Sequence, residues 1–228
     1  MMYSEYTVES ASALMRRVFG WMTAGLLATA GTAYAVYAIP ALKTLFFGHF
    51  GIMILLILAQ LGLVIYLSAG ISRMSASTAT FSYILYSVLT GITFSTLFAQ
   101  FTQESLALTF LVCAGMFATM TLYGFVTRSD LSGMGNYLLM GLFGLILVSI
   151  INMFFHSNTM ELAISIIGVA IFTLLTAYDV QRIKHLGMSM IADEEDISKV
   201  SILCALTLYL DFVNLFLYLL RFLGQKKD

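Results

Sequence analysis

The sequence predicts an all-α membrane protein, a bundle of seven transmembrane helices. Hydrophobic residues make up 60% of the chain and charged residues only 10%, whereas a soluble domain usually carries about 25% charged residues. The mean hydropathy is +0.94. The apolar residues also form long blocks separated by short polar breaks, which is the pattern of spanning helices.

Each apolar block is close to the ~20 residues that cross the hydrocarbon core of a bilayer. The blocks do not alternate as β-barrel strands do. They are Phe19–Ile39, Gly51–Ala69, Ala79–Phe98, Leu106–Val126, Tyr137–Phe155, Leu162–Asp179 and Ile202–Leu223. The longest connection is expected from Gln181 to Ser201. The chain therefore divides into an N-terminal arm (1–17), a transmembrane domain (18–224) and a C-terminal tail (225–228).

The positive charges predict that the N-terminus is cytoplasmic, because cytoplasmic flanks of spanning helices carry an excess of Lys and Arg. In that orientation the inner flanks hold seven such residues and the outer flanks four, three of them at the C-terminal end. The inner residues are Arg16, Arg17, Arg73, Arg128, Arg182, Lys184 and Lys199. The outer ones are Lys43, Arg221, Lys226 and Lys227. The C-terminal end disagrees with the rule, but the last block is long enough to cross fully.

Asp211 lies about ten residues from either end of the last block. A central aspartate costs about 2.5 to 3.5 kcal/mol in membrane insertion, so it must face the bundle interior, a partner or water. Thr207 and Asn214 lie at helical spacing from it and form one polar stripe with it. A helix-packing hydrogen bond is the simpler interpretation, but the rarity of intramembrane acids favours a functional role.

Asp179 is the expected partner of Asp211. It ends the sixth block, and consecutive helices with a short connection tend to be antiparallel neighbours. If the two carboxyls meet in a medium of low dielectric, they cannot both ionise cheaply, and they would share one proton. An interfacial aspartate paired with Arg182, three residues later, is an equally plausible role for Asp179 alone.

Several other functions are disfavoured by composition. The net charge of −1 gives no basic field for nucleic acid. Cys113 and Cys204 lie inside apolar blocks and are expected to be ordinary buried residues. No cofactor is expected.

Specific motifs resemble the Bax-inhibitor family of membrane proteins over nearly the whole chain. The C-terminal signature is Ala177-Tyr178-Asp179 with Gln181, Ile183 and Lys184, followed by SILCALTLYLDFVNLFLYLLRFLG. Upstream, RVFGWM, AQLGLVIYLSAGI, YSVLTGIT and TLYGFVTRSDLSGMGN are also similar to bacterial members. The resemblance implies a multi-pass protein of the inner membrane, with seven helices and a central last helix.

The resemblance also implies a function. Members of the family are described as pH-sensitive calcium leak pathways gated by two aspartates, which correspond to Asp179 and Asp211. Arg73 is the nearest candidate for an arginine that locks the pair, with Asn214 and Thr207 in support. Calcium is then a transported ion and not a cofactor. Gln60 replaces a glutamate that some members carry, which removes one acid from the expected path.

Two other functions compete with the calcium leak. The chain could instead regulate a membrane partner, as some bacterial relatives interact with a membrane-bound AAA protease, and residues 1–15 would be the cytoplasmic contact. An intramembrane aspartyl protease is disfavoured because Leu208-Tyr209-Leu210-Asp211 replaces Gly-x-Gly-Asp and the Pro-Ala-Leu motif is missing. HExxH and GxSxG motifs are also missing. We therefore do not expect an enzyme.

The charge bias makes a prediction about topology. Reporters fused after Met1 and near Met188 should both report the cytoplasm, and a reporter after Thr159 should report the opposite side. A fusion at Asp228 separates a crossing last helix from a re-entrant one. Reporters near Met188 and after Thr159 on the same side would show that the helix count is wrong.

Overall fold

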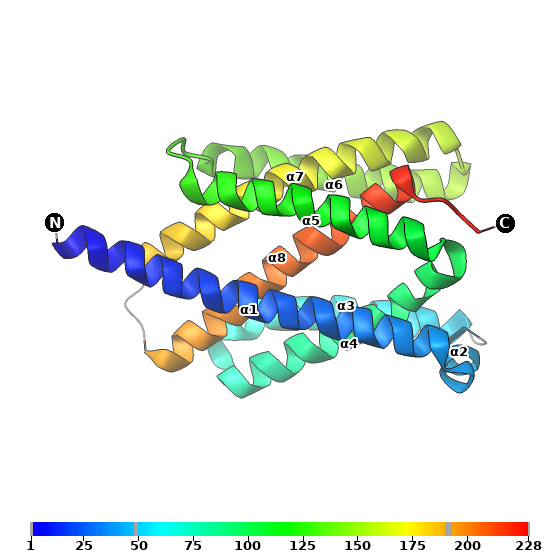
Figure 1. Cartoon of the computed structure of the whole chain (residues 1–228), viewed down its shortest axis with the longest axis horizontal. Coiled ribbons are helices and arrows are strands. Elements are labelled where there is room, and N and C mark those ends of the chain that lie inside the picture. The colour runs from blue at the N-terminus through cyan, green and yellow to red at the C-terminus, as the bar shows by residue number, and fades with distance from the viewer. Residues whose placement is uncertain (1, 48–49, 190–192, 228) are drawn as a thin grey trace. The chain divides into compact units, whose positions relative to one another are not determined.

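The computed structural model describes residues 2–47, 50–189 and 193–227, and these contain helices and turns but no β-strand. The described part holds eight α-helices and one 3-10 helix (Figure 1). They are α1 (Met2–Ala38), α2 (Pro40–Phe47), α3 (Phe50–Gly70), η1 (Ile71–Arg73), α4 (Ala76–Gln100), α5 (Gln103–Val126), α6 (Ser132–Phe155), α7 (Asn158–Ser189) and α8 (Glu194–Leu223).

The protein is a helical membrane bundle, as the sequence predicts. Six helices are long and apolar enough to cross a membrane. A seventh span results if α1 and α2 count together, although a bend of 99° separates them. Pro40 begins α2, and a proline disfavours helical geometry in the residue before it, so α1 ends at Ala38. The first predicted block exceeds α1 by one residue, and the other blocks lie within α3 to α8.

Local sequence explains other helix ends. The Ser75 side chain accepts a hydrogen bond from the amide of Thr78 (3.2 Å) at the start of α4. Thr102 accepts one from the amide of Ser105 (3.3 Å) at the start of α5. Both are N-caps, which satisfy amides that the first helical turn leaves unpaired.

The expected long connection from Gln181 to Ser201 is wrong. Helix α7 continues to Ser189 and α8 begins at Glu194, so most of this segment is helical. Val180 and Ile183 are buried, which extends the packed face of α7 beyond its apolar block. Acidic residues in the first turn of α8 favour its N-terminus because they complement the helix dipole.

The helices group into two compact units, and the boundary inside α8 falls between Tyr209 and Leu210. The first unit comprises Met1–Phe101, Gly187–Tyr209 and Lys227–Asp228. In it, α1 and α4 run side by side (Figure 1). Gly91 allows this close approach, because an added Cβ would lie 2.6 Å from the carbonyl oxygen of Thr29.

The N-terminal part of α1 is held by contacts within the first unit. Arg17 forms a bidentate ion pair with Glu194, with N–O distances of 2.8 and 3.0 Å. The Ser10 hydroxyl donates to the carbonyl of Gly187 (3.0 Å). Ala11 beside it is buried. Residues 9–17 are therefore packed helix continuous with the first span.

The C-terminal tail contacts the C-terminal end of α4. The Lys227 amide donates to the carbonyl of Gln100 (2.9 Å), and its ammonium donates to the carbonyl of Phe98 (2.8 Å). The ammonium also lies 5.4 Å from the ring centroid of Tyr37, which stacks on Phe98. Lys227 thus satisfies carbonyls that the last turn of α4 leaves without intrahelical partners.

The second unit comprises Thr102–Leu186 and Leu210–Lys226. Its aromatic residues pack on the final part of α8. The ring of Phe212 contacts those of Phe110 and Phe117, at centroid distances of 5.5 and 5.4 Å. Tyr218 stacks on Phe172 of α7 at 5.8 Å. These contacts place the final part of α8 against both α5 and α7.

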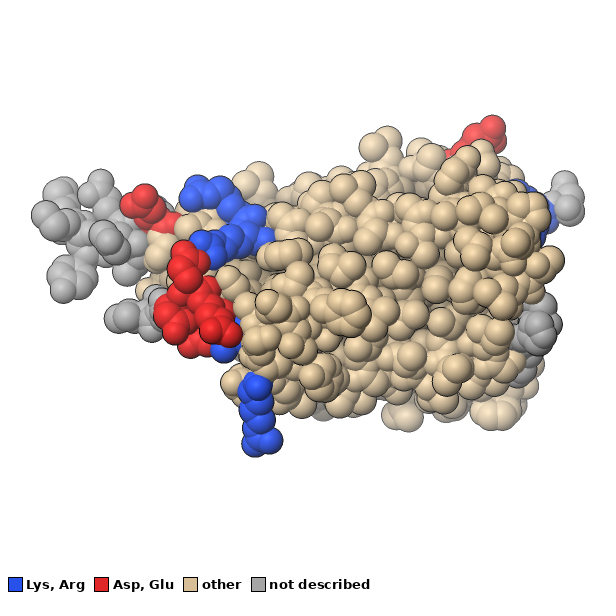
Figure 2. Space-filling model, turned by 90° about the horizontal axis from the view of Figure 1, so that it is seen from below, with Lys and Arg blue, Asp and Glu red and all other residues tan. Residues whose placement is uncertain are grey.

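Burial and charge agree with a membrane environment. Of the six candidate spans, α8 has the largest buried share, 61%, against 44% or less for the others. Figure 2 shows one face of the protein, on which acidic and basic side chains gather toward the ends and leave an uncharged belt between them. Such a belt suits the hydrocarbon core of a bilayer.

The close approach of α1 and α4 predicts a destabilising substitution. Gly91→Ala should lower the free energy of unfolding by about 1–3 kcal/mol, because the new methyl meets the Thr29 carbonyl and the Cβ of Thr32, and neither is the end of a flexible side chain. Gly115→Ala is the matched control, since no atom lies within 4 Å of a Cβ built there. Thermal unfolding in detergent measures both. Equal midpoints for the two variants would contradict the packing at Gly91.

Candidate functional site

Asp179 and Asp211 lie together in the second unit. Asp179 is on α7 and Asp211 is on α8, and their carboxyl groups are close enough to interact electrostatically and by hydrogen bonding. Both residues are buried, with exposed fractions of 7% and 5%. Two ionised carboxylates cannot form such a bond, because neither has a hydrogen to donate. A hydrogen bond between the two acids thus requires a proton on one of them.

The second oxygen of Asp211 has a different environment. Oδ2 is buried and has no hydrogen-bond partner among the described residues. Buried polar atoms usually have a partner, so an unpaired one marks a place where a ligand or water can bind. One oxygen of the Asp211 carboxyl can thus interact with Asp179, while the other can accept a hydrogen bond from water or bind a ligand.

Asp179 has a basic neighbour as well. Nη1 of Arg182 lies 4.0 Å from Oδ1 of Asp179, one helical turn along α7. The Arg182 side chain is 71% exposed, whereas that of Asp179 is 9% exposed. The buried acid therefore has a solvent-facing cation on its own helix.

Helix α5 fixes the part of α7 that carries Asp179. Gly124 of α5 packs against the backbone of Ala177, and an added Cβ would collide with that carbonyl. The Lys184 ammonium donates to the carbonyl of Phe125 at 2.6 Å. These contacts on both sides of Asp179 hold α7 close to α5.

Gln181 ties α7 to the loop between α5 and α6. Its amide nitrogen donates to the carbonyl of Ser129, and its oxygen accepts from the amide of Leu131, both at 2.8 Å. Gln181 is 5% exposed. In the same loop, hydrogen bonds from Ser132 hold the pKa of the exposed Asp130 carboxyl below its ordinary value. The loop is thus ordered by α7 and by its own capping interactions.

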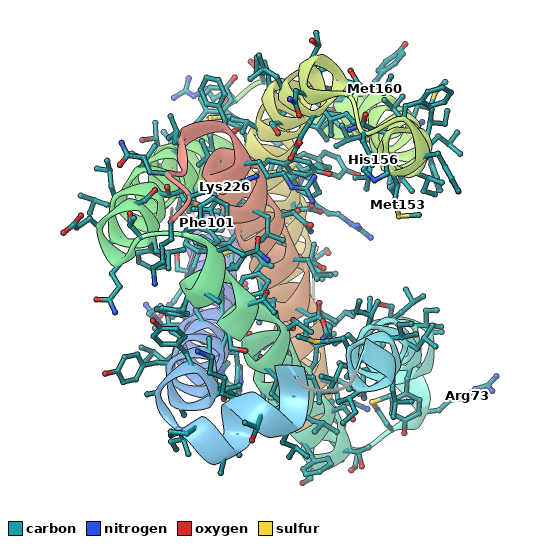
Figure 3. All side chains as sticks on the ribbon, turned by 90° about the vertical axis from the view of Figure 1, so that its right-hand side faces the viewer. Arg73, Phe101, Met153, His156, Met160 and Lys226 are labelled. Carbon is teal, nitrogen blue, oxygen red and sulfur yellow. The ribbon has the colours of Figure 1, made fainter. Side chains whose placement is uncertain are left out.

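The other predicted residues have different surroundings. Asn214 donates to the carbonyl of Leu210 (2.8 Å) and Thr207 to that of Leu203 (3.2 Å), so both bond to their own helix. Arg73 is exposed, and Figure 3 shows its side chain extending away from the helices. It belongs to the first unit and the acids to the second, so its locking role stays a prediction.

Gln60 has a structural role in the first unit. Its amide nitrogen donates to the carbonyl of Leu89 (3.2 Å) and lies 3.5 Å from the hydroxyl of Thr93. An ionised glutamate could not donate these bonds. The amide at this position therefore suits a tie between α3 and α4.

A buried hydroxyl cluster in the first unit was not predicted. The hydroxyl of Tyr209 lies 2.6 Å from that of Thr29, which also donates to the carbonyl of Ser87. The rings of Tyr83 and Tyr86 pack edge-on against Tyr209. Tyrosines within apolar blocks look like ordinary core residues in the sequence. Only the presence of several such tyrosines could have indicated a buried hydroxyl cluster. Among the described residues, no group of three or more His, Cys, Asp or Glu could hold a metal ion.

Comparison with known proteins gives one family. The sequence model of the family described as "Inhibitor of apoptosis-promoting Bax1" matches residues 11–228. The inner membrane protein YbhL of Escherichia coli is 48% identical over 214 residues, covering 93% of this chain and 92% of that protein. A Borreliella burgdorferi protein is 46% identical, covering 94% and 92%. A Deinococcus radiodurans protein is 39% identical, covering 100% and 96%.

The Gln181 contacts predict local destabilisation on substitution. Gln181→Met keeps the approximate size but leaves the Leu131 amide and the Ser129 carbonyl without their partners, at a cost of about 1–3 kcal/mol. Hydrogen exchange of the Leu131 amide should therefore become faster. Gln103→Met, at an exposed position, is the control. Unchanged exchange at Leu131 would mean that the loop is held by other contacts.

Proposed function

The chain belongs to the Bax inhibitor family, and we propose that it is a pH-sensitive cation leak pathway of the inner membrane. The proposed gate is a proton shared between Asp179 and Asp211. The observation that carries this proposal is the close approach of two buried acids from different helices. Intramembrane acids are costly, and they commonly mark ion or proton pathways.

The electrostatics of the pair can supply the energy for gating. Loss of the shared proton leaves two negative charges, which at 4 Å repel by about 4 kcal/mol at an effective dielectric of 20. Moving a two-state balance from 1:99 to 99:1 takes about 5.5 kcal/mol. Repulsion of this size therefore changes the open population substantially, and higher pH favours separation of α7 from α8.

A carboxylate released from the pair also suits the proposed cargo. Calcium prefers oxygen ligands, and Asp211 already has one buried oxygen without a partner. A proton and a cation then compete for the same carboxylate. Gating and competition both predict that acid reduces calcium flux.

The alternative is a regulator that binds a membrane protease or another membrane partner. A regulator needs no ion pathway, so the role of the buried acids would be limited to helix packing. An inactive protein in liposomes would favour this alternative over the leak.

Calcium flux into liposomes containing purified protein tests the proposal. Flux should fall from about pH 8 to about pH 5 as the pair takes up its proton. Asp211→Asn keeps the shape but cannot ionise, so its flux should no longer depend on pH. Asp179→Asn should behave in the same way if the pair is the gate.

Asp130→Asn is the control, because it removes an exposed acid in the α5–α6 loop and should leave the pH response intact. A pH response that survives Asp179→Asn would reduce Asp179 to an interfacial anchor. Wild-type liposomes that pass no more calcium than empty ones across this range would reject the leak.

A further inference from the structure

We infer that Arg182 determines which acid carries the shared proton, so that Asp179 is the ionised acceptor and Asp211 the protonated donor. The inference deepens the proposed function and rests on it for its role in gating. In this proposal Arg182 contacts neither the transported cation nor the shared proton. It is therefore a positioning residue that acts through Asp179.

The two carboxyls differ in the charges that face them. Asp179 has the guanidinium of Arg182 at 4.0 Å, in addition to the carboxyl of Asp211. None of the ion pairs found among the described residues involves Asp211. A negative charge is more stable beside a cation than in uncompensated apolar surroundings. The charge of the pair therefore belongs on Asp179, and the proton on Asp211.

Hydrogen-bond geometry supports the same assignment. Each protonated carboxyl donates one hydrogen bond, and an ionised carboxylate only accepts. With the proton on Asp211, its bond to Asp179 is donated, and its other oxygen is a neutral carbonyl without a partner. An unpaired neutral oxygen costs far less in a buried place than an unpaired charged one. The reverse assignment would leave a negative charge at this site.

Other charged residues of the second unit do not replace Arg182. Helix α6 carries none, and the only one on α5 is Glu104 in its first turn. Lys184 is engaged by the carbonyl and the ring of Phe125. Arg221 on α8 lies over the ring of Tyr218. Among the described residues, Arg182 is the one cation that forms an ion pair with either acid.

Infrared titration of single variants tests which acid holds the proton. The signal is the stretching band of the protonated carboxyl, with the spectrum of the Asp179→Asn, Asp211→Asn double variant subtracted. Asp179→Asn leaves Asp211 without a cation, so the band should persist at neutral pH. Asp211→Asn leaves Asp179 facing Arg182, so the band should be absent there. The reverse result, or equal titration of the two variants, would overturn the inference.

Substitution of Arg182 tests the cause. In the Asp211→Asn background, Arg182→Gln should move loss of the band to higher pH by roughly half a unit, the size expected for an exposed ion pair. Arg182→Lys should keep most of the original midpoint. Arg128→Gln, which removes an exposed arginine of the neighbouring loop, is the control and should shift nothing.

An Arg182→Gln midpoint equal to that of Arg128→Gln would refute the role of Arg182. This readout separates the inference from the proposed function. Band shifts without calcium flux in wild-type liposomes would retain the proton assignment and reject the leak. Flux that depends on pH, with no band shift in Arg182→Gln, would retain the leak and reject the assignment.

Discussion

A carboxyl group inside an apolar bundle needs a hydrogen-bonding partner, and much of the second unit serves this need. Asp211 reaches Asp179 because α7 is held against α5 by the close contact at Gly124 and by the bond from Lys184 to Phe125. Gln181 fixes the adjoining loop from the same helix. Because these contacts lie within two helical turns of Asp179, they fix the position of this acid on α7.

Much of the fold follows from composition. Long apolar blocks must span, so the apolar part of each spanning helix could be predicted, but α1 begins 17 residues before its predicted block and α7 ends ten residues after its block. The helical segment after Gln181 has no apolar block to reveal it, because its buried residues alternate with charged ones. The meeting of Asp179 and Asp211 follows from antiparallel neighbours, but the direction of Arg73 and the bonds of Gln181 depend on tertiary packing, which spacing does not encode.

The C-terminal end shows how structure modifies a rule based on charge. Lys227 adds a positive charge to a flank where the topology rule expects few. Its ammonium binds the carbonyl of Phe98 in the last turn of α4 and lies over Tyr37. The negative end of a helix dipole favours a cation, so this lysine has a local electrostatic reason for its position. A count of charges treats Lys227 as a solvent-exposed flank charge, although its ammonium is bound to the end of α4.

The position of Asp211 near the middle of α8 also makes membrane voltage relevant. A proton that joins or leaves this residue travels through part of the electric field across the bilayer. One elementary charge that crosses the whole field changes its energy by about 2.3 kcal/mol per 100 mV. Even half of that is comparable to the effect of about one pH unit. Proton exchange at this depth, as the proposed gate requires, would therefore respond to the electrical as well as the chemical part of the proton gradient.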